Sequence, residues 1–307
     1  MGPEPEGASE ASGRAARGHR AGVVAILGLP NAGKSTLINR LLGEKLAIVT
    51  ARPQTTRSRI LGILTRPDAQ VLFYDTPGLH RAKGALGRAL NAQVLEAAED
   101  CDVALLLVDL CRGLEPAHAE LFHVLGRGHA RLLVVGTKLD LPGARERAWP
   151  PSGHPEGTPA LRISAHTGEG VEELLERVVE LLPEGPPYYA GEEITDRPVR
   201  FLAAELVREA AFELLAEEIP YCLAVRIAEF DESDPERIRI RAEILVERES
   251  QKRIVIGSGG RMIREIGIRA RREIERLLGT RVHLELWVKV APRWARSPRS
   301  LRTLGYF

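Results

Sequence analysis

The sequence of 307 residues predicts an α/β fold, a doubly wound parallel sheet, followed by a smaller α+β domain. Short apolar runs recur at residues 22–28, 70–75, 102–109, 131–136 and 160–164, as expected for parallel strands buried on both faces. Helix-like stretches at residues 35–42, 86–98 and 116–125 separate most of these runs, and a fourth at 171–182 follows the last. A stretch rich in Pro and Gly at residues 183–198 then has the composition of an extended interdomain linker.

Beyond this linker the pattern predicts the order α-β-β-α-α-β. The expected elements are helix 199–217, strands 221–230 and 237–247, a short helix before residue 257, helix 261–278 and strand 281–290. We therefore divide the chain into a disordered leader at 1–20, a first domain at 21–182, the linker at 183–198, and a second domain with a basic tail at 199–307. The Pro-rich segment 141–159 interrupts the first domain and is interpreted as a long surface loop.

The formal net charge of +1 conceals two opposite charges. Residues 251–307 hold 14 Lys and Arg against 4 Asp and Glu, a local charge of +10. The preceding 250 residues hold 29 basic and 38 acidic residues, a charge of −9. A basic module joined to an acidic body indicates a nucleic-acid partner for the second domain.

Cysteine usage and hydropathy exclude several classes of protein. The three cysteines form no C-x-x-C pair, which argues against a zinc site or a disulfide framework and suits a reducing, cytoplasmic compartment. No apolar run approaches the ~18 residues of a membrane-spanning helix.

A phosphate-binding loop follows the first apolar run. Residues 28–35 read GLPNAGKS and fit G-x-x-x-x-G-K-[ST], in which backbone N–H groups surround the phosphates of a nucleoside triphosphate. Lys34 should neutralise the β- and γ-phosphates, and the Ser35 hydroxyl should bind Mg²⁺. The residues of this loop expected to bind the nucleotide are Asn31, Ala32, Gly33, Lys34, Ser35 and Thr36.

A second motif, D-T-P-G at residues 75–78, directly follows the run VLFY. Asp75 at the carboxyl end of a strand can reach Mg²⁺, and the Gly78 N–H can contact the γ-phosphate. Its position, about 40 residues after the phosphate loop, makes this common motif specific.

Guanine recognition is expected from residues after the last two strands. Asp140 of T-K-L-D can accept hydrogen bonds from both N1–H and the exocyclic amine of guanine, a donor pair that adenine lacks. A backbone N–H of Ser164-Ala165 would contact the guanine carbonyl oxygen. The predicted base-binding set is Thr137, Lys138, Asp140, Ser164 and Ala165.

Several longer segments carry a resemblance to one family. These are GLPNAGKST, PQTTR, DTPGLH, TKLD, SAHTGEG, the linker PEGPPYYAGEEITDRPVRFLAAELVRE, VERESQKRIVIGSGG and the ending LELWVKV…LRTLGYF. From residue 22 to 307 the chain resembles the translation-factor-like GTPases, and closely resembles the bacterial Era family. The resemblance implies a P-loop GTPase domain and a type II KH domain. It also implies GTP/GDP and Mg²⁺ as ligands, and small-subunit ribosomal RNA and the maturing small ribosomal subunit as partners. We expect a monomer, with peripheral membrane contact as a further hypothesis.

Mapped onto this chain, the resemblance places Thr55 and Thr56 in the switch I segment. Thr56 is favoured as the residue that closes over the γ-phosphate and Mg²⁺, so Lys34, Thr56 and Gly78 form the predicted catalytic set and Ser35, Thr56 and Asp75 the metal set. Two departures stand out. Thr137 replaces the usual Asn of the family, which should lower guanine affinity. Leu79 occupies the position where Ras-like enzymes carry a water-orienting Gln, so intrinsic hydrolysis should be slow.

The basic module contains a G-x-x-G turn at Gly257, Ser258, Gly259 and Gly260. In KH domains such a turn holds the backbone of about four nucleotides. Ser258 carries no charge, so the predicted backbone contacts come from Lys252, Arg253, Arg261 and Arg264. Of the tryptophans here, Trp287 is expected in the core and Trp294 in an RNA-stacking role.

Two alternatives follow from the departures. The missing Gln at Leu79 allows a passive RNA-binding assembly protein in which GTP is only a structural ligand. Thr137 allows an ATPase.

The combination of Asn31 and Leu79 predicts potassium-dependent hydrolysis, because similar Gln-less GTPases use a potassium ion held by the P-loop Asn. GTP turnover measured as phosphate release should be faster in potassium than in sodium buffer. Equal turnover in the two salts would contradict this hypothesis.

Overall fold

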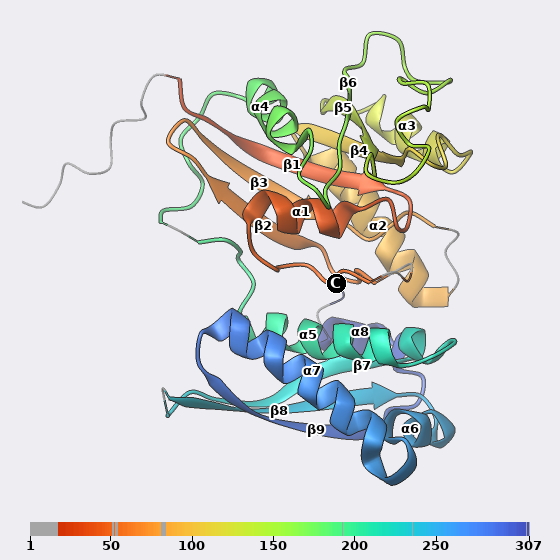
Figure 1. Cartoon of the computed structure of the whole chain (residues 1–307), viewed down its shortest axis with the longest axis vertical. Helices are drawn as coiled ribbons and strands as arrows, with labels where there is room; N and C mark the ends of the chain where they lie inside the picture. The colour runs from red at the N-terminus through yellow and green to blue at the C-terminus, as the bar shows by residue number, and fades with distance from the viewer. Residues whose placement is uncertain are drawn as a thin grey trace, which may run out of the picture.

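The computed structural model describes residues 18–50, 52, 55–80, 84–191, 193–234, 236–304 and 306. Most of the predicted leader, and Pro53 and Gln54 of switch I, lie outside these residues. Figure 1 shows a sheet with helices on both sides above a smaller domain in which helices cover one side of a second sheet.

The first sheet has the strand order β2-β3-β1-β4-β5-β6. Its strands are β1 (Arg20–Gly28), β2 (Ile60–Thr65), β3 (Ala69–Asp75), β4 (Val103–Asp109), β5 (Arg131–Thr137) and β6 (Ala160–Arg162). Only β2 runs antiparallel to its neighbour among these strands. Because β1 lies between β3 and β4, the strand order reverses at its carboxyl end, where ligands bind in such folds.

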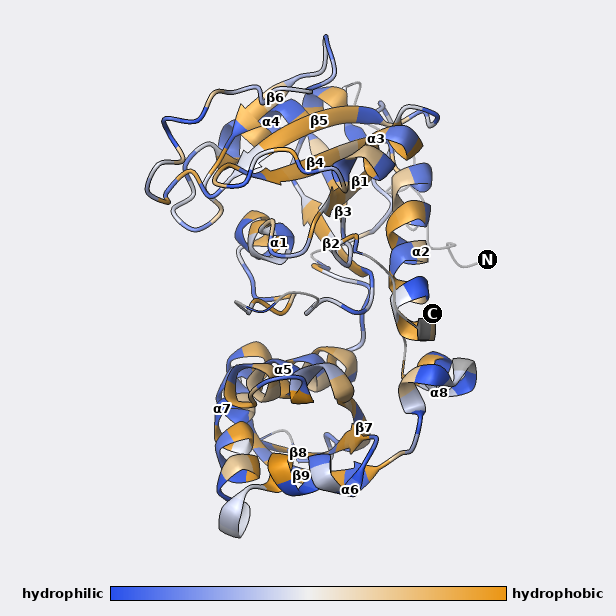
Figure 2. Ribbon diagram, turned by 90° about the vertical axis from the view of Figure 1, so that its right-hand side faces the viewer, coloured by the Kyte–Doolittle hydropathy of each residue, from blue (hydrophilic) through white to orange (hydrophobic). Residues whose placement is uncertain are grey.

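Helices cover both faces of this sheet, which confirms the doubly wound fold. Its helices are α1 (Lys34–Leu42), α2 (Gly84–Asp100), α3 (His118–Leu125) and α4 (Val171–Leu181). Leu37 of α1 and Leu174 of α4 belong to one buried apolar cluster, and Val94 of α2 and Leu121 of α3 to another. Figure 2 shows the hydrophobic strands β4 and β5 in orange within this domain.

The sequence pattern did not identify β2. Its segment ILGILT pairs antiparallel with β3, and the interruption of the apolar run by Gly62 hid the strand. A Cβ atom at Gly62 would lie 2.6 Å from a methyl group of Leu42, so the glycine allows close packing of β2 on α1.

The second domain has the predicted order α-β-β-α-α-β. Its elements are α5 (Val199–Leu214), β7 (Ala224–Asp231), β8 (Arg237–Val246), α6 (Glu249–Ile256), α7 (Arg261–Leu278) and β9 (Arg281–Val290). In the sheet β7-β8-β9, β8 pairs antiparallel with β7 and parallel with β9. Residues from α5, α7 and the inner face of this sheet form one buried cluster. A short helical turn, η1 (Ile219–Cys222), replaces the predicted start of β7.

The expectations for two tryptophans were wrong. Trp287 on β9 is 56% exposed, whereas Trp294 in the turn η3 (Trp294–Arg296) is only 2% exposed. The tail folds back through α8 (Pro298–Thr303), packs Trp294 beside Leu301 and Tyr306, and the indole Nε1 donates to the Cys222 carbonyl at 3.0 Å. The basic tail is therefore part of the fold.

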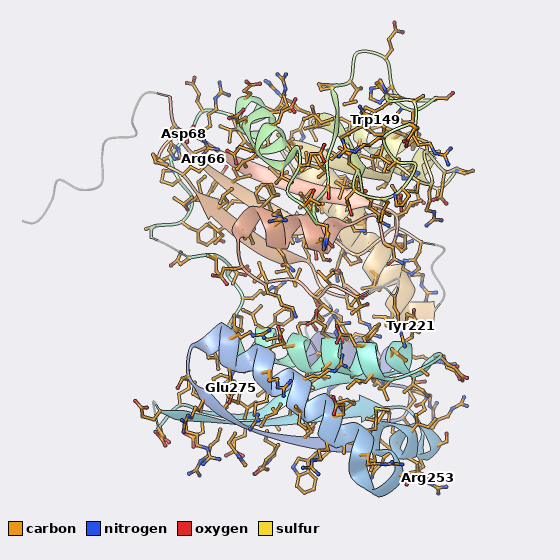
Figure 3. The ribbon with its side chains drawn as sticks, in the orientation of Figure 1. Arg66, Asp68, Trp149, Tyr221, Arg253 and Glu275 are labelled. Atoms are coloured by element: carbon orange, nitrogen blue, oxygen red, sulfur yellow. The ribbon has the colours of Figure 1, made fainter. Side chains whose placement is uncertain are left out.

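The segment 141–159 contains no helix or strand, in agreement with the loop prediction. It is attached to the sheet, because Ala144 is buried and Trp149 packs beside Leu110 and Leu139 (Figure 3). Within the described part of the chain, no helix combines the length and apolarity needed to cross a bilayer.

The opposite environments of the tryptophans predict opposite effects on stability. Trp294→Ala should lower the free energy of unfolding by about 3–5 kcal/mol, because it removes a buried indole. Trp287→Ala should change it by at most ~0.5 kcal/mol, since the side chain is exposed. Urea denaturation followed by circular dichroism measures both. Equal losses in the two variants would contradict this placement of the tail.

Candidate nucleotide site and nucleic-acid groove

The phosphate loop connects β1 to α1 at the point where the strand order reverses. The Lys34 ammonium donates to the carbonyls of Gly28 at 3.3 Å and Leu29 at 3.0 Å and so lies over its own loop. Burial lowers the pKa of Lys34 to about 8, opposed by the nearby Asp75 carboxylate. A buried cation beside the loop N–H groups is suited to binding phosphate.

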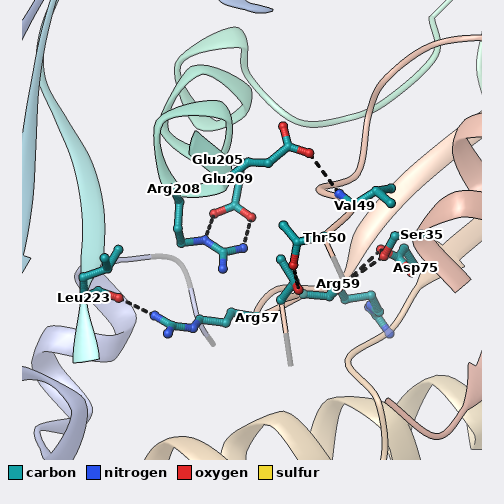
Figure 4. Close-up of polar contacts among 12 residues, drawn as sticks. Ser35, Val49, Thr50, Arg57, Arg59, Asp75, Glu205, Arg208, Glu209 and Leu223 are labelled. Carbon is teal, nitrogen blue, oxygen red and sulfur yellow. Dashed lines mark hydrogen bonds and ion pairs between the residues drawn. The ribbon is translucent and has the colours of Figure 1, made fainter. Parts of the chain in front are cut away.

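Three predicted metal ligands lie together at the edge of this loop. The Ser35 hydroxyl donates to Asp75 Oδ2 at 2.8 Å and lies 3.0 Å from the Thr56 hydroxyl, which is 3.4 Å from the same carboxylate oxygen (Figure 4). Burial raises the pKa of Asp75 to about 6, opposed by Lys34. The other carboxylate oxygen, Oδ1, is buried without a hydrogen-bond partner. Three oxygen ligands, one incompletely bonded, fit the chemistry of Mg²⁺.

The two switch I threonines point to different partners. The Thr55 hydroxyl donates to the Arg52 carbonyl at 2.9 Å and lies 3.0 Å from the Thr50 hydroxyl. Thr55 thus bonds within its own segment, whereas Thr56 reaches Ser35 and Asp75.

A cavity of about 420 Å³ lies between the phosphate loop and the switch I segment. Its lining residues are Pro30, Asn31, Gly33, Lys34, Ser35, Thr36, Ile48, Val49, Thr50, Arg52, Thr55, Thr56 and Lys138. Sequence patterns do not identify the lining residues Ile48, Val49, Thr50 and Arg52, because they belong to no motif and are marked only by their position before Thr55 and Thr56.

The predicted guanine-binding residues gather at the ends of β5 and β6. The Asp140 carboxylate accepts a hydrogen bond from the Ser164 hydroxyl at 2.5 Å, and this bond holds the pKa of Asp140 below its usual value. Lys138 forms an ion pair with Asp109 at 2.7 Å. The Ala165 carbonyl accepts a hydrogen bond from Arg40 Nε at 3.0 Å. The backbone N–H of Ala165 is the group that is predicted to contact the base.

Thr137 connects the base-binding motif to the phosphate loop. Its buried hydroxyl lies 2.8 Å from the Ala32 carbonyl, to which it donates, and 3.3 Å from the Val108 carbonyl. The threonine is thus tethered to the loop, but it has no amide group to extend toward a base.

Gly78 and Leu79 lie against the phosphate loop from the other side. A Cβ atom at Gly78 would lie 2.7 Å from the Pro30 backbone, so only glycine permits this approach. The Leu79 N–H donates to the Gly28 carbonyl at 3.2 Å, while its side chain is 2% exposed in the apolar cluster of α2 and α3. Leu79 does not line the cavity and cannot orient water there.

The switch I segment is also bound to the second domain (Figure 4). The buried Arg57 guanidinium donates to the carbonyls of Leu223 at 2.5 Å, Tyr221 at 3.0 Å and Pro220 at 3.2 Å. The rings of Phe212 and Trp294 lie 5.6 and 5.8 Å from it, within the range of cation–π attraction.

A second link lies before this segment, at Lys45 and Val49. The Val49 N–H donates to Glu209 of α5 at 3.1 Å, and Lys45 forms an ion pair with the same carboxylate at 2.7 Å. Residues that line the nucleotide cavity therefore contact the second domain directly.

The G-x-x-G turn lies between α6 and α7 and is open to solvent. Gly259 and Gly260 have φ angles of 58° and 76°, and a Cβ atom at either would meet no atom within 4 Å. A chain backbone can thus approach this turn closely.

A groove of about 540 Å³ runs beside this turn, between α7 and β9. Its lining residues are Ile263, Arg264, Gly267, Ile268, Arg271, Val282, His283, Leu284 and Leu286. Of the predicted RNA-binding residues, only Arg264 lines it. Arg261 bonds the Ser258 carbonyl at 3.4 Å, and Lys252 and Arg253 lie on α6 (Figure 3). The β9 residues were missed because the sequence does not reveal which strand borders α7.

Comparison with known proteins identifies the family. A family model described as "50S ribosome-binding GTPase" matches residues 23–138, and a KH domain model matches residues 218–295. The GTPase Era of Geobacter sp. (strain M21) is 44% identical over 94% of this chain and 98% of its own length. That of Leuconostoc citreum is 42% identical over 94% and 96%. The chain belongs to the Era family of GTPases.

Two solved structures are similar to this family member over both domains. One is Era in complex with MgGDPNP and nucleotides 1506–1542 of 16S ribosomal RNA, and the other is a variant of Aquifex aeolicus Era bound to GDP·AlF₄⁻. Each has a TM-score of 0.89 and 41% sequence identity and covers 94% of this chain and 99% of its own. The fold class, a P-loop GTPase domain followed by a type II KH domain, is thereby confirmed.

The tether from Thr137 predicts a change in nucleotide affinity. Thr137→Val keeps the buried shape but removes the hydrogen bond to the Ala32 carbonyl, so GDP should bind about five- to tenfold more weakly. Thr137→Asn should bind GDP more tightly than the natural chain, because its amide can reach both the loop and the base. Isothermal titration calorimetry measures both affinities. Unchanged GDP binding in Thr137→Val would show that the tether does not support the site.

Proposed function

We propose that this chain hydrolyses GTP to GDP and phosphate, and that its nucleotide state controls the binding of the KH domain to small-subunit ribosomal RNA during maturation of the small subunit. One observation carries the proposal: two adjacent residues of switch I contact the nucleotide site and the second domain. Thr56 lies at the metal-binding oxygens, and Arg57 is buried in the second domain. A shift of Thr56 that follows phosphate loss would be passed to Arg57 through a single peptide unit.

The chemistry assigned to this site is in-line attack of water on the γ-phosphate. Lys34, the loop N–H groups and the Gly78 N–H would stabilise the charge that develops on the phosphate oxygens. Ser35, Thr56 and Asp75 would hold Mg²⁺, which supplies further positive charge when bound. Asp140, oriented by Ser164, would select guanine.

The RNA partner is supported by the solved structure of Era in complex with nucleotides 1506–1542 of 16S ribosomal RNA, which is 41% identical and covers 94% of this chain. The family model described as "50S ribosome-binding GTPase" matches residues 23–138, which include no part of the KH domain. Its description therefore does not concern the RNA that the KH domain binds. The open G-x-x-G turn and the groove beside α7 provide the surface, with Arg264 and Arg271 as its cations. We place this function in the cytoplasm and in a monomer, and keep peripheral membrane contact as a hypothesis.

Because the buried Leu79 cannot orient water, one alternative is an RNA-binding protein in which GTP is only a structural ligand. Multiple-turnover phosphate release would remove it. Competition of labelled GTP by excess ATP tests the other alternative, an ATPase.

Crosslinking to ribosomal RNA with and without a non-hydrolysable GTP analogue tests target and switching together. In the natural chain the analogue should change the yield of small-subunit RNA crosslinks. Lys34→Ala should bind GTP at least ~100-fold more weakly and respond to no nucleotide, because it removes the cation at the phosphates. Retained GTP affinity of Lys34→Ala in calorimetry would refute the site assignment.

Arg57→Ala separates the switch from the nucleotide site. GTP affinity should stay within about threefold, because Arg57 does not line the cavity, while the response of RNA binding to the analogue should be lost. Arg66→Ala, which removes ion pairs with exposed carboxylates on the surface of the first domain, is the control and should leave the nucleotide response unchanged. A full nucleotide response in Arg57→Ala would contradict the coupling.

A further inference from the structure

The outward face of the KH sheet carries an exposed tryptophan. Side chains alternate along β9, so Val282, Leu284, Leu286 and Val288 face the helices, whereas Trp287 faces away from them and is 56% exposed. Figures 1 and 2 show α5 between this sheet and the GTPase domain and β9 on the side of the second domain that is far from the GTPase domain. An exposed indole in the middle of a strand is a stacking surface rather than a core residue.

Two carboxylates lie beside this indole, and each is paired with basic side chains. In the sheet register Trp287 lies opposite Glu243, which is nearly buried and forms ion pairs with Arg226 at 2.6 Å and Lys289 at 2.5 Å. Hydrogen bonds from Arg241 and His283 lower the pKa of Glu285, and the Trp287 indole is a further hydrogen-bond donor to that carboxylate. Trp287 is therefore an exposed indole beside the Glu285 carboxylate.

A cavity of about 330 Å³ lies on the same face, beside Lys289 of β9. Arg226, Lys289 and Arg299 line it, together with Ser300 and an apolar floor that includes Leu245. Arg226 and Lys289 share the single carboxylate of Glu243, and Arg299 is a third cation in the lining, so the cavity carries excess positive charge. Lys289 follows Trp287 by two residues, a rise of about 7 Å along a strand, which is close to the spacing of one extended nucleotide.

This face is continuous with the G-x-x-G groove. β9 is the edge strand of the sheet, and its residue His283 lines the groove while pointing to the same side as Trp287. A single strand that leaves the groove across β9 reaches Trp287 within four residues of the strand, a distance of about 13 Å.

We propose that the outward face of β7-β8-β9 is a second binding site for single-stranded nucleic acid. One base stacks on Trp287, and the neighbouring phosphate enters the cavity between Arg226, Lys289 and Arg299. Excess positive charge near an exposed indole matches a nucleic acid better than a protein surface, since phosphates provide negative charge and bases provide stacking faces. This site goes beyond the function proposed above, which requires only the G-x-x-G groove.

Tryptophan fluorescence reports on this site directly, because the other two indoles, Trp149 and Trp294, are half-buried and buried. In the full chain, uridine dodecamer and RNA spanning nucleotides 1506–1542 of 16S ribosomal RNA should both quench the exposed fluorescence, and Trp287→Phe should lose this signal. Trp287→Ala should weaken the binding of both RNAs about tenfold, while Trp287→Phe, which keeps an aromatic ring, should stay within about threefold. Arg299→Ala should reduce the salt dependence of binding by about one phosphate contact.

Unquenched fluorescence at saturating RNA, or natural RNA affinity in a folded Trp287→Ala variant, would overturn the proposal. The proposal would also be overturned if Trp287→Ala weakened the binding of a protein partner and left RNA binding unchanged. Arg264→Ala in the groove distinguishes the two sites. In this variant the binding of the 16S RNA should weaken, while the dodecamer should still quench Trp287. If the natural chain does not bind the 16S RNA but the dodecamer quenches Trp287, the function proposed above fails and the second site stands.

Discussion

The buried Arg57 guanidinium is the interaction on which the arrangement of the two domains depends. Burial lowers its pKa, but an arginine remains charged at any physiological pH. Three carbonyls from residues 220–223 and the rings of Phe212 and Trp294 solvate this charge in place of water. Withdrawing the side chain would leave those carbonyls without a donor, so switch I cannot move far without repositioning the second domain or breaking this set of bonds.

The tail completes this binding site. Trp294 forms one wall of the Arg57 environment, and its own N–H is satisfied by Cys222, the residue before Leu223. The Tyr306 carbonyl also accepts a hydrogen bond from Gln93 of α2 at 2.7 Å, so the tail touches the helix that follows Leu79. Arg57, next to Thr56, and Gln93 of α2 thus both contact the cluster formed by Trp294, Leu301 and Tyr306.

The basic residues of the second domain are distributed unevenly over its surface. Part of the basic excess is consumed by ion pairs, as in Arg269 with Glu213 and Arg276 with Glu273. Arg264 and Arg271 line the α7–β9 groove, and Arg299 adds a third cation to the cavity where Arg226 and Lys289 share Glu243. These surfaces meet at β9, which explains how one short domain can offer a continuous track to a polyanion.

Local motifs were predictable because each is a run of adjacent residues whose chemistry does not depend on the rest of the chain. The phosphate loop, D-T-P-G, T-K-L-D and the G-x-x-G turn are of this kind, and the buried strands before them follow from hydropathy alone. The environment of Trp287 and Trp294, the strand β2 and the partners of Arg57 were not predictable in this way. Burial depends on which surface a segment meets, and that surface comes from residues distant in the chain: Cys222 lies 72 positions from Trp294, and Leu223 lies 166 from Arg57. The order of residues therefore specified the chemistry of the nucleotide site, while long-range packing selected the face that is open to a nucleic acid and the side chain that joins the two domains.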